Sequence, residues 1–272
     1  MIIVVLAVFG LIFGSFVNAL VWRLRQQELA GKKSKKQYSI LTGRSMCPEC
    51  HHELAAKDLV PVLSWLSLKG KCRYCREPIS GQYPLVELAT AIMFVFSYIY
   101  WPLDLHGAGL VQLVFWLFFV VAFMALAVYD LKWFLLPDRL VYPLVAMAST
   151  EVIVVAFLRQ SWTFAASSVL GALVLSGTFY VLFQISKGNW IGGGDVKLGL
   201  VLGLLAGSSF RAVIVIFLAS LFGTAVSLPL LVKSKKNIQT RVPFGPFLLL
   251  ATVVVVLFGS SLVSWYDKLL LK

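Results

Sequence analysis

The sequence predicts an all-α polytopic membrane protein with about eight transmembrane helices and one small polar domain between helices 1 and 2. Hydrophobic residues fill 60% of the 272 positions, charged residues only 13%, and the mean hydropathy is +0.88. A soluble domain carries about 25% charged residues, so a soluble enzyme and a disordered protein are both excluded. Irregular spans would leave backbone amides unpaired in lipid, and the apolar runs are too long and continuous for barrel strands.

The first apolar run covers residues 1–22 and has no basic residue ahead of its apolar stretch, whereas Arg23 and Arg25 follow it directly. A secretory signal carries its charges before the apolar stretch and ends in a small-residue cleavage site. We therefore expect a retained first helix. Further runs near the roughly 20 residues that a span requires cover 84–101, 109–130, 139–158, 164–186, 195–209, 210–232 and 243–266. The run at 195–209 is short.

These runs divide the chain into three predicted parts. Residues 1–22 form the first transmembrane helix, residues 23–83 form a polar domain, and residues 84–272 form a membrane core of helices 2–8. The segment 23–83 is the only stretch large enough for a small soluble domain.

The basic residues predict the orientation of the chain. If residues 23–83 are cytoplasmic, the cytoplasmic loops hold 20 of the 24 Lys and Arg residues, and the outer loops and tail hold four. Basic residues favour the cytoplasmic side of a membrane, so we expect both termini outside. Orientation alone explains the net charge of +12. The expected partner is thus the lipid bilayer, and the positive charge does not require a nucleic-acid partner to explain it.

All four cysteines lie in the predicted polar domain, as Cys47-Pro-Glu-Cys50 and Cys72-Arg-Tyr-Cys75. Two such C-x2-C pairs typically wrap one tetrahedral Zn²⁺ through four thiolates. Two disulfides are the alternative, but the segment faces a reducing compartment by its charge. A closed shell of four sulfurs leaves no open position, so this zinc is expected to be structural.

Two acidic residues, Asp130 and Asp195, abut apolar runs, where an ionised group is costly and is often functional. The third crossing runs inward and ends at Asp130, and the sixth begins inside at Asp195. Both carboxylates are therefore expected near the cytoplasmic face. Two close carboxylates cannot both ionise cheaply and share a proton. Such a pair suits peptide hydrolysis, because one member deprotonates a water while the other donates to the scissile carbonyl oxygen.

The helix after Asp195 is predicted to pack closely on a neighbour. Gly199, Gly203 and Gly207 recur at every fourth position and form a ridge of small residues. The run Gly192–Gly194 ahead of Asp195 permits backbone conformations and close approaches that a side chain would block.

Simpler interpretations of the acids remain open. Asp195 can cap the sixth helix, and Asp130 can end the third beside Lys132. Asp138 competes with Asp130 as the partner of Asp195, although its place just before the fourth crossing is typical of an N-cap.

Five blocks, in order, resemble those of the type IV prepilin peptidases. They are Gly14-Ser15-Phe16-Val17-Asn18 with Arg23, the two C-x2-C pairs, Tyr83-Pro84-Leu85-Val86-Glu87-Leu88, Asp130 with Leu136-Pro137-Asp138, and Gly192-Gly193-Gly194-Asp195-Val196-Lys197-Leu198. The last block is similar to the family's GxGD motif, and the blocks span most of the chain.

The resemblance implies a membrane aspartic endopeptidase of the bacterial cytoplasmic membrane, with Asp130 and Asp195 as the catalytic pair. Gly192, Gly193, Gly194, Lys197 and Asp138 are the supporting residues that it implies. The implied substrates are prepilins or pseudopilins, whose short basic leader ends in glycine and precedes an apolar helix. The bond to be cut then lies at the cytoplasmic face, at the depth expected for the aspartates.

Many members of that family also methylate the new N-terminus with S-adenosylmethionine. The first-helix block and the cysteine domain are associated with that activity, so Gly14, Ser15, Asn18, Arg23 and Glu87 are candidates for methylation or substrate binding. No glycine-rich nucleotide loop is present. Glu87 is alternatively an interfacial glutamate that reaches water, and Asn18 and Arg23 alternatively serve helix packing and anchoring.

A second function class also fits the residues. In a non-enzymatic membrane transport or assembly protein, the aspartates would carry ions or protons and the zinc domain would dock a partner.

Overall fold

The computed structural model describes residues 1–29, 38–40, 42–233 and 242–270, and these residues are all-helical apart from loops and two isolated β-bridges. The predicted fold class is confirmed. Contacts divide the chain into two compact units. The first comprises Met1–Ile99 with Val120–Ala125, and the second comprises Tyr100–Phe119 with Leu126–Lys272.

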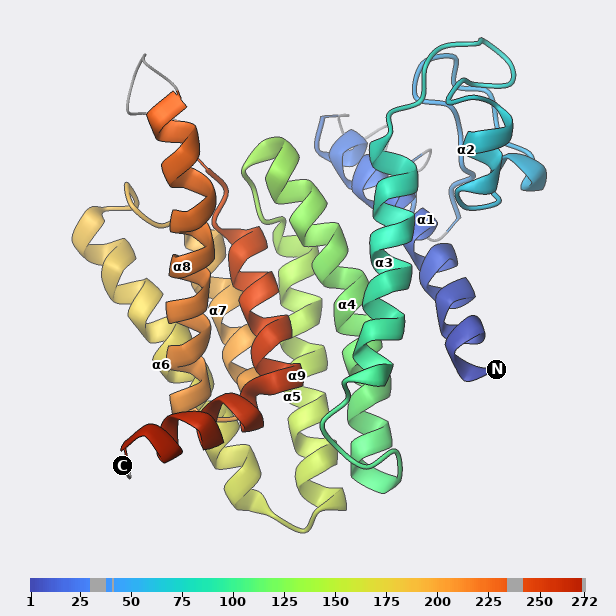
Figure 1. The fold of residues 1–272 in the computed structure, drawn as a ribbon. Helices are drawn as coiled ribbons and strands as arrows, with labels where there is room; N and C mark the ends of the chain where they lie inside the picture. The colour runs from blue at the N-terminus through green and yellow to red at the C-terminus, as the bar shows by residue number, and fades with distance from the viewer. Residues whose placement is uncertain (30–37, 41, 234–241, 271–272) are drawn as a thin grey trace. The chain divides into compact units, whose positions relative to one another are not determined.

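The first unit pairs two long helices with a small loop-rich segment between them in sequence. The long helices are α1 (Ile2–Leu29) and α3 (Gln82–Ile99), and the segment holds the short helices η2 (Ala56–Asp58) and α2 (Leu63–Ser67). Figure 1 shows α1 and α3 in blue and green, with α2 in the segment that joins them. Helix α1 runs seven residues beyond the predicted span, so it includes Arg23 and Arg25.

The second unit is a bundle of long helices (Figure 1). Its helices are α4 (Gly107–Trp133), of which Val120–Ala125 groups with the first unit, α5 (Asp138–Leu158), α6 (Trp162–Ser186), α7 (Gly193–Ala206), α8 (Ser209–Lys233) and α9 (Gly245–Leu270). Helix α7 packs on α5, α6, α8 and α9, and α6 and α9 both pack on α8.

Among the described residues, seven helices are long and apolar enough to cross a membrane, namely α1, α3, α4, α5, α6, α8 and α9. The predicted crossing at 195–209 corresponds to α7, which has 14 residues. At about 1.5 Å per residue, it is shorter than the hydrocarbon core of a bilayer, about 30 Å.

Large apolar side chains remain exposed along these helices, for example Phe157 at 74%, Phe217 at 64% and Ile185 at 67%. Water would penalise so much exposed apolar surface. A lipid environment removes that penalty, and the exposed faces are therefore those expected to meet the bilayer.

Glycines set the spacing of α1 and α3. A methyl group at Gly10 would lie 2.5 Å from the Cα of Ala91, and one at Gly14 would lie 2.5 Å from the Cα of Glu87. Real side chains do not approach backbone this closely, so only glycine permits the two helices to pack at this separation.

The predicted glycine ridge on α7 is present at two of its three positions. Methyl groups at Gly199 and Gly203 would collide with the α6 backbone at Ser176 and Ala172. The Ser176 hydroxyl also donates to the carbonyl oxygen of Val196, at 2.8 Å. The prediction is wrong for Gly207, where an added methyl would meet nothing within 4 Å and φ is +75°. It ends the helix, because glycine adopts this left-handed conformation without strain.

The Gly203→Ala variant tests this packing. The added methyl would lie 2.6 Å from the carbonyl oxygen of Gly171, and such overpacking costs about 1–3 kcal/mol. Gly177→Ala is the matched control, because a methyl at this α6 position meets nothing within 4 Å. Unfolding of the detergent-solubilised variants should show Gly203→Ala destabilised and Gly177→Ala unchanged or slightly stabilised. Equal stability of the two variants would contradict the proposed role of Gly203.

Candidate functional site

Asp130 lies in the last turn of α4 and is 6% exposed. The helix ends just beyond it, where the left-handed residue Phe134 donates its backbone N–H to the Asp130 carbonyl oxygen, at 2.8 Å. The Asp130 side chain accepts a hydrogen bond from the backbone N–H of Gly245, with 3.1 Å between the nitrogen and Oδ2. Gly245 is the first residue of α9. The end of one helix and the start of another thus meet at this carboxylate.

Asp195 is the third residue of α7. The N-cap is Gly192, in an extended conformation, so the interpretation of Asp195 as the N-cap is wrong. The Asp195 carboxylate lies near the Gly192 backbone. A methyl at Gly194 would lie 3.0 Å from the Cβ of Leu136. This glycine therefore permits the close approach of α7 to the segment that precedes α5.

Both acids belong to the second unit, and Leu136 lies beside each of them: a methyl at Gly194, next to Asp195, or at Gly245, which binds Asp130, would contact the Leu136 side chain. The two acids come from the C-terminal turn of α4 and the N-terminal turn of α7, 65 positions apart in the sequence. Lys132, which the sequence offered as a neighbour of Asp130, instead lies over the Trp133 ring, 5.5 Å from its centroid.

Asp138 has a different partner. Its two carboxylate oxygens accept hydrogen bonds from the Lys197 ammonium at 2.8 and 2.9 Å. The predicted N-cap role is wrong, because Pro137 is the N-cap of α5 and Asp138 is the first helical residue. The ion pair joins α5 to α7, two residues beyond Asp195 in the sequence. Because Asp138 is engaged by Lys197, Asp130 is the remaining candidate partner of Asp195.

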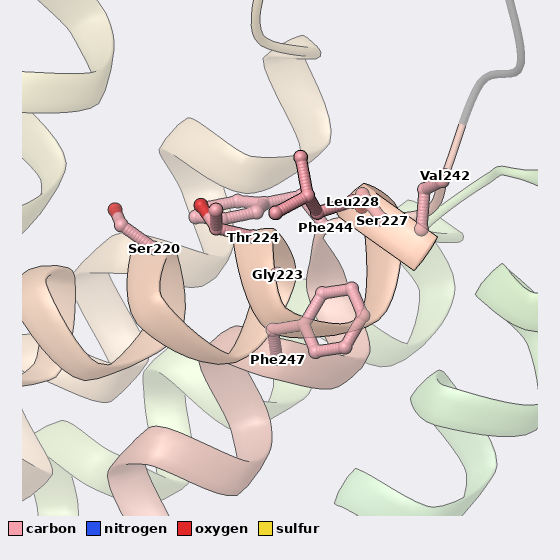
Figure 2. Close-up of a pocket in the computed structure, with 8 residues that line it drawn as sticks. All are labelled: Ser220, Gly223, Thr224, Ser227, Leu228, Val242, Phe244 and Phe247. Carbon is pink, nitrogen blue, oxygen red and sulfur yellow. The ribbon is translucent and has the colours of Figure 1, made fainter. Parts of the chain in front are cut away.

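A cavity of about 420 Å³ lies between α8 and the start of α9 (Figure 2). Its lining is mostly apolar and comprises Ser220, Gly223, Thr224, Ser227, Leu228, Val242, Phe244 and Phe247. Phe244, which lines the cavity, immediately precedes Gly245, whose backbone N–H binds Asp130.

Sequence reasoning missed the contribution of Phe244 and Gly245, because it treated residues 243–266 only as an apolar crossing. A signal was available in Pro243-Phe244-Gly245-Pro246. Proline is favoured in the first turn of a helix, and glycine beside it indicates close approach of another group.

The four cysteines of the first unit form one cluster. Their sulfurs all lie within 4.8 Å of one another, and 3.9 Å separates the sulfurs of Cys47 and Cys75. None of the four is in a disulfide. Four sulfurs around a tetrahedral Zn²⁺, with bonds of about 2.3 Å, lie about 3.8 Å apart. The cluster therefore fits a metal of this kind.

Two equivalent turns build the cluster. In each, the residue after the second cysteine, His51 or Arg76, is left-handed and donates its N–H to the carbonyl oxygen of the first cysteine. Antiparallel bridges, Met46 with Glu53 and Lys71 with Pro78, close the two turns in the same way.

The second turn favours a thiolate at Cys72. Burial opposes ionisation of this thiol, but hydrogen bonds from the backbone of Cys75 and Tyr74 lower its pKa to about 7. A thiolate is the form that ligates a metal.

Asp58 supports this turn from η2. Its side chain is 3% exposed and accepts hydrogen bonds from Arg73 Nε at 2.6 Å and the Tyr74 hydroxyl at 3.1 Å. Burial alone would raise the pKa of Asp58, but these donors outweigh burial and lower the pKa below its usual value. The carboxylate therefore stays ionised at neutral pH.

The candidates for methylation or substrate binding, from the first-helix block and from Glu87 of α3, all lie in the first unit. Asn18 donates to the carbonyl oxygens of Tyr83 at 3.1 Å and Gly14 at 3.3 Å. Glu87 is 6% exposed, accepts the N–H of Val62 at 2.7 Å, and interacts with Ser15. Glu87 therefore ties α3 to the cysteine segment, and it is not the interfacial residue reaching water that the sequence allowed.

Arg23 is also buried, at 7% exposure, and its guanidinium donates to the carbonyl oxygen of Ile40, at 3.1 Å. This contact ties the end of α1 to the segment that precedes the first cysteine pair.

Comparison with known proteins gives two matches to family models. Residues 8–101 match the bacterial peptidase A24 N-terminal domain, and residues 116–228 match the type IV leader peptidase family. The second match contains Asp130 and Asp195, and the first contains the four cysteines.

Curated relatives are similar over nearly the whole chain. A prepilin leader peptidase/N-methyltransferase of Aeromonas hydrophila is 31% identical over 95% of this chain and 91% of its own length. One of Bacillus subtilis is 31% identical over 98% of both chains. An Escherichia coli type 4 prepilin-like proteins leader peptide-processing enzyme is 34% identical over 91% of this chain and 90% of its own. No solved structure matches.

Proposed function

We propose that this chain is a multi-pass membrane aspartic endopeptidase that removes the leader of prepilins or pseudopilins. The chain belongs to the type IV leader peptidase family. It cuts after the glycine that ends the basic leader and then N-methylates the exposed terminus. The proposal is supported by the placement of Asp130 and Asp195 at helix ends of one bundle, with the Leu136 side chain beside both.

The pair supports hydrolysis without a covalent intermediate. One aspartate, ionised, removes a proton from a water that attacks the scissile carbonyl carbon. The other, protonated, donates to the carbonyl oxygen as the tetrahedral intermediate forms. When this intermediate collapses, the aspartate that took the proton of the water gives it to the nitrogen of the leaving segment and the C–N bond breaks. The hydroxyl formed from the carbonyl oxygen returns its proton to the other aspartate, which restores the starting pair. Gly192–Gly194 and the Lys197–Asp138 ion pair hold the first turn of α7 in place for this chemistry.

The site is proposed to open at the cytoplasmic face of the bacterial inner membrane, with both termini outside and α7 as a short eighth crossing. This orientation is supported by the excess of Lys and Arg in alternate loops. A prepilin holds its apolar helix in the bilayer and its basic leader in the cytoplasm, so the bond to be cut lies at the depth where α4 ends and α7 begins.

The polar domain at residues 23–83 is proposed to hold one structural Zn²⁺ through Cys47, Cys50, Cys72 and Cys75. Bound there, the metal supplies folding energy rather than a reactive water, because all four positions are taken by sulfur. The domain is too small to bury much apolar surface, and a metal compensates for this in small domains.

Methylation is proposed from the names of the relatives and from the first-helix block that the chain retains. Gly14, Ser15, Asn18, Arg23 and Glu87 all lie in the first unit, which also holds the cysteines. S-adenosylmethionine would supply the methyl group. The polar atoms of Asn18 and Glu87 already bind protein groups, so these residues alone do not form a site for the donor. Their role is to hold the first unit in shape.

Replacement of either aspartate tests the peptidase. Asp130→Asn and Asp195→Asn should each lower cleavage of a purified prepilin at least about a thousandfold, because neither remaining acid works alone. Asp104→Asn, at an exposed loop position, is the control and should cleave normally. Gel analysis of leader removal in proteoliposomes measures the effect. If either single variant still cleaves well, the paired mechanism is wrong and the transport class returns to consideration.

Metal analysis tests the cysteine domain. The purified protein should contain about one zinc ion per chain, and Cys50→Ser should lose it, because three thiolates leave the tetrahedral shell incomplete. Lys57→Ala, at an exposed position of the same segment and outside the cluster, should keep the metal. A folded protein with oxidised cysteines and no zinc would reverse the assignment.

Mass spectrometry of the mature pilin tests methylation. The wild-type chain with S-adenosylmethionine should add the mass of one methyl group to the new N-terminus. Glu87→Ala should reduce methylation more than cleavage, because it leaves the Val62 N–H without its acceptor in the first unit. Glu53→Ala removes an exposed ion pair of the same unit, which contributes little, and serves as the control. An unmethylated product of active wild-type enzyme would remove this part of the proposal.

A further inference from the structure

The start of α9 supplies a fixed donor to Asp130. The hydrogen bond between Gly245 N and Asp130 Oδ2 is 3.1 Å long and buried. The first N–H groups of a helix have no partner within the helix and carry its positive dipole end, so they bind anions well. Here the bound anion is a side chain of the protein, 115 positions away in the sequence.

The same position has no room for a side chain. A methyl at Gly245 would lie 2.5 Å from Asp130 Oδ2. Its next neighbours, Asp130 Cγ at 3.4 Å and Leu136 Cδ2 at 3.5 Å, would be at ordinary van der Waals distances. Only the carboxylate oxygen is in conflict. The requirement for glycine at this position therefore comes from the presence of the acid.

Phe244 fixes the position of this donor. Its ring packs edge-on against Phe179 of α6, with 6.1 Å between the centroids. Phe244 is the residue before Gly245 and lines the cavity shown in Figure 2. The aromatic contact anchors the start of α9 to α6 and so holds the Gly245 N–H in register with Asp130.

We propose that Gly245 is a positioning residue of the peptidase: its N–H orients Asp130, and its missing side chain gives the carboxylate the space that this orientation needs. A backbone N–H does not ionise near neutral pH, so it orients one carboxylate oxygen without acting as an acid itself. With Oδ2 engaged, Oδ1 is the oxygen left for the water or for the proton shared with Asp195. This inference rests on the proposed function only where it assigns Asp130 to catalysis.

Steady-state kinetics of Gly245→Ala provide the first test. The methyl group displaces the Asp130 carboxylate, and a misplacement of about 1 Å costs about a hundredfold in rate. We expect kcat for prepilin cleavage to fall by about that factor while KM stays within about twofold, because the substrate-binding surface is unchanged. Gly177→Ala, a glycine of α6 with open space around it, should retain both constants. A normal kcat in Gly245→Ala would overturn the proposal, and so would a change confined to KM.

A double-mutant cycle keeps the inference testable even where Gly245→Ala is unstable. The unfolding midpoint should fall in Gly245→Ala, but adding Gly245→Ala to Asp130→Ala should cause no further fall, because the conflicting oxygen is gone. The matched cycle of Gly177→Ala with Asp130→Ala should be additive. Additivity in the Gly245 cycle would overturn the inference.

This cycle is measured on protein stability and needs no substrate. If the wild-type chain fails to cleave prepilins while the Gly245 cycle is non-additive, the proposed function fails but the contact between Gly245 and Asp130 stands.

Discussion

The second unit is organised around the cost of placing two carboxyl groups, the buried Asp130 and the half-buried Asp195, within an apolar helical bundle. In an apolar bundle such groups are stabilised only by hydrogen bonds, by a shared proton, or by the ends of helices. Each acid lies at a helix terminus: Asp130 where α4 ends and α9 begins, and Asp195 in the first turn of α7. Backbone N–H groups are thereby available where the negative charge is held. In the proposed mechanism, this arrangement lets the two acids share one proton.

Glycine provides the space that this arrangement requires. Gly199 and Gly203 let α7 approach the α6 backbone, Gly194 admits the side chain of Leu136, and Gly245 admits the carboxylate of Asp130. Each of these positions would be overpacked by a single methyl group. Because α7 has only 14 residues and no long polar side chain to anchor its centre, its placement depends on these close contacts and on the ion pair between Lys197 and Asp138.

The sequence predicts much of this, because its signals are local and strong. Apolar runs predict the long helices to within a few residues at most ends, and the C-x2-C spacing predicts the cysteine cluster. What failed were details that depend on tertiary contacts. Helix α1 was predicted to end at residue 22 but continues to Leu29. Arg23 lies within the helix and is buried, and its guanidinium donates to the carbonyl oxygen of Ile40. Asp138 binds Lys197 instead of capping α5. Gly245 was overlooked because its partner lies 115 residues away, and no local pattern specifies such a pairing.

The chain separates its chemistry between two compact units. The aspartates, the ion pair at Lys197 and the donor at Gly245 all lie in the second unit, whereas the cysteine cluster, Glu87 and Asn18 lie in the first. Within the first unit the buried polar groups bind one another and the backbone, so their loss would loosen α1, α3 and the cysteine segment together. Within the second, each contact bears on the geometry of the acids. The residues proposed for peptide hydrolysis and those proposed for methylation therefore belong to different units.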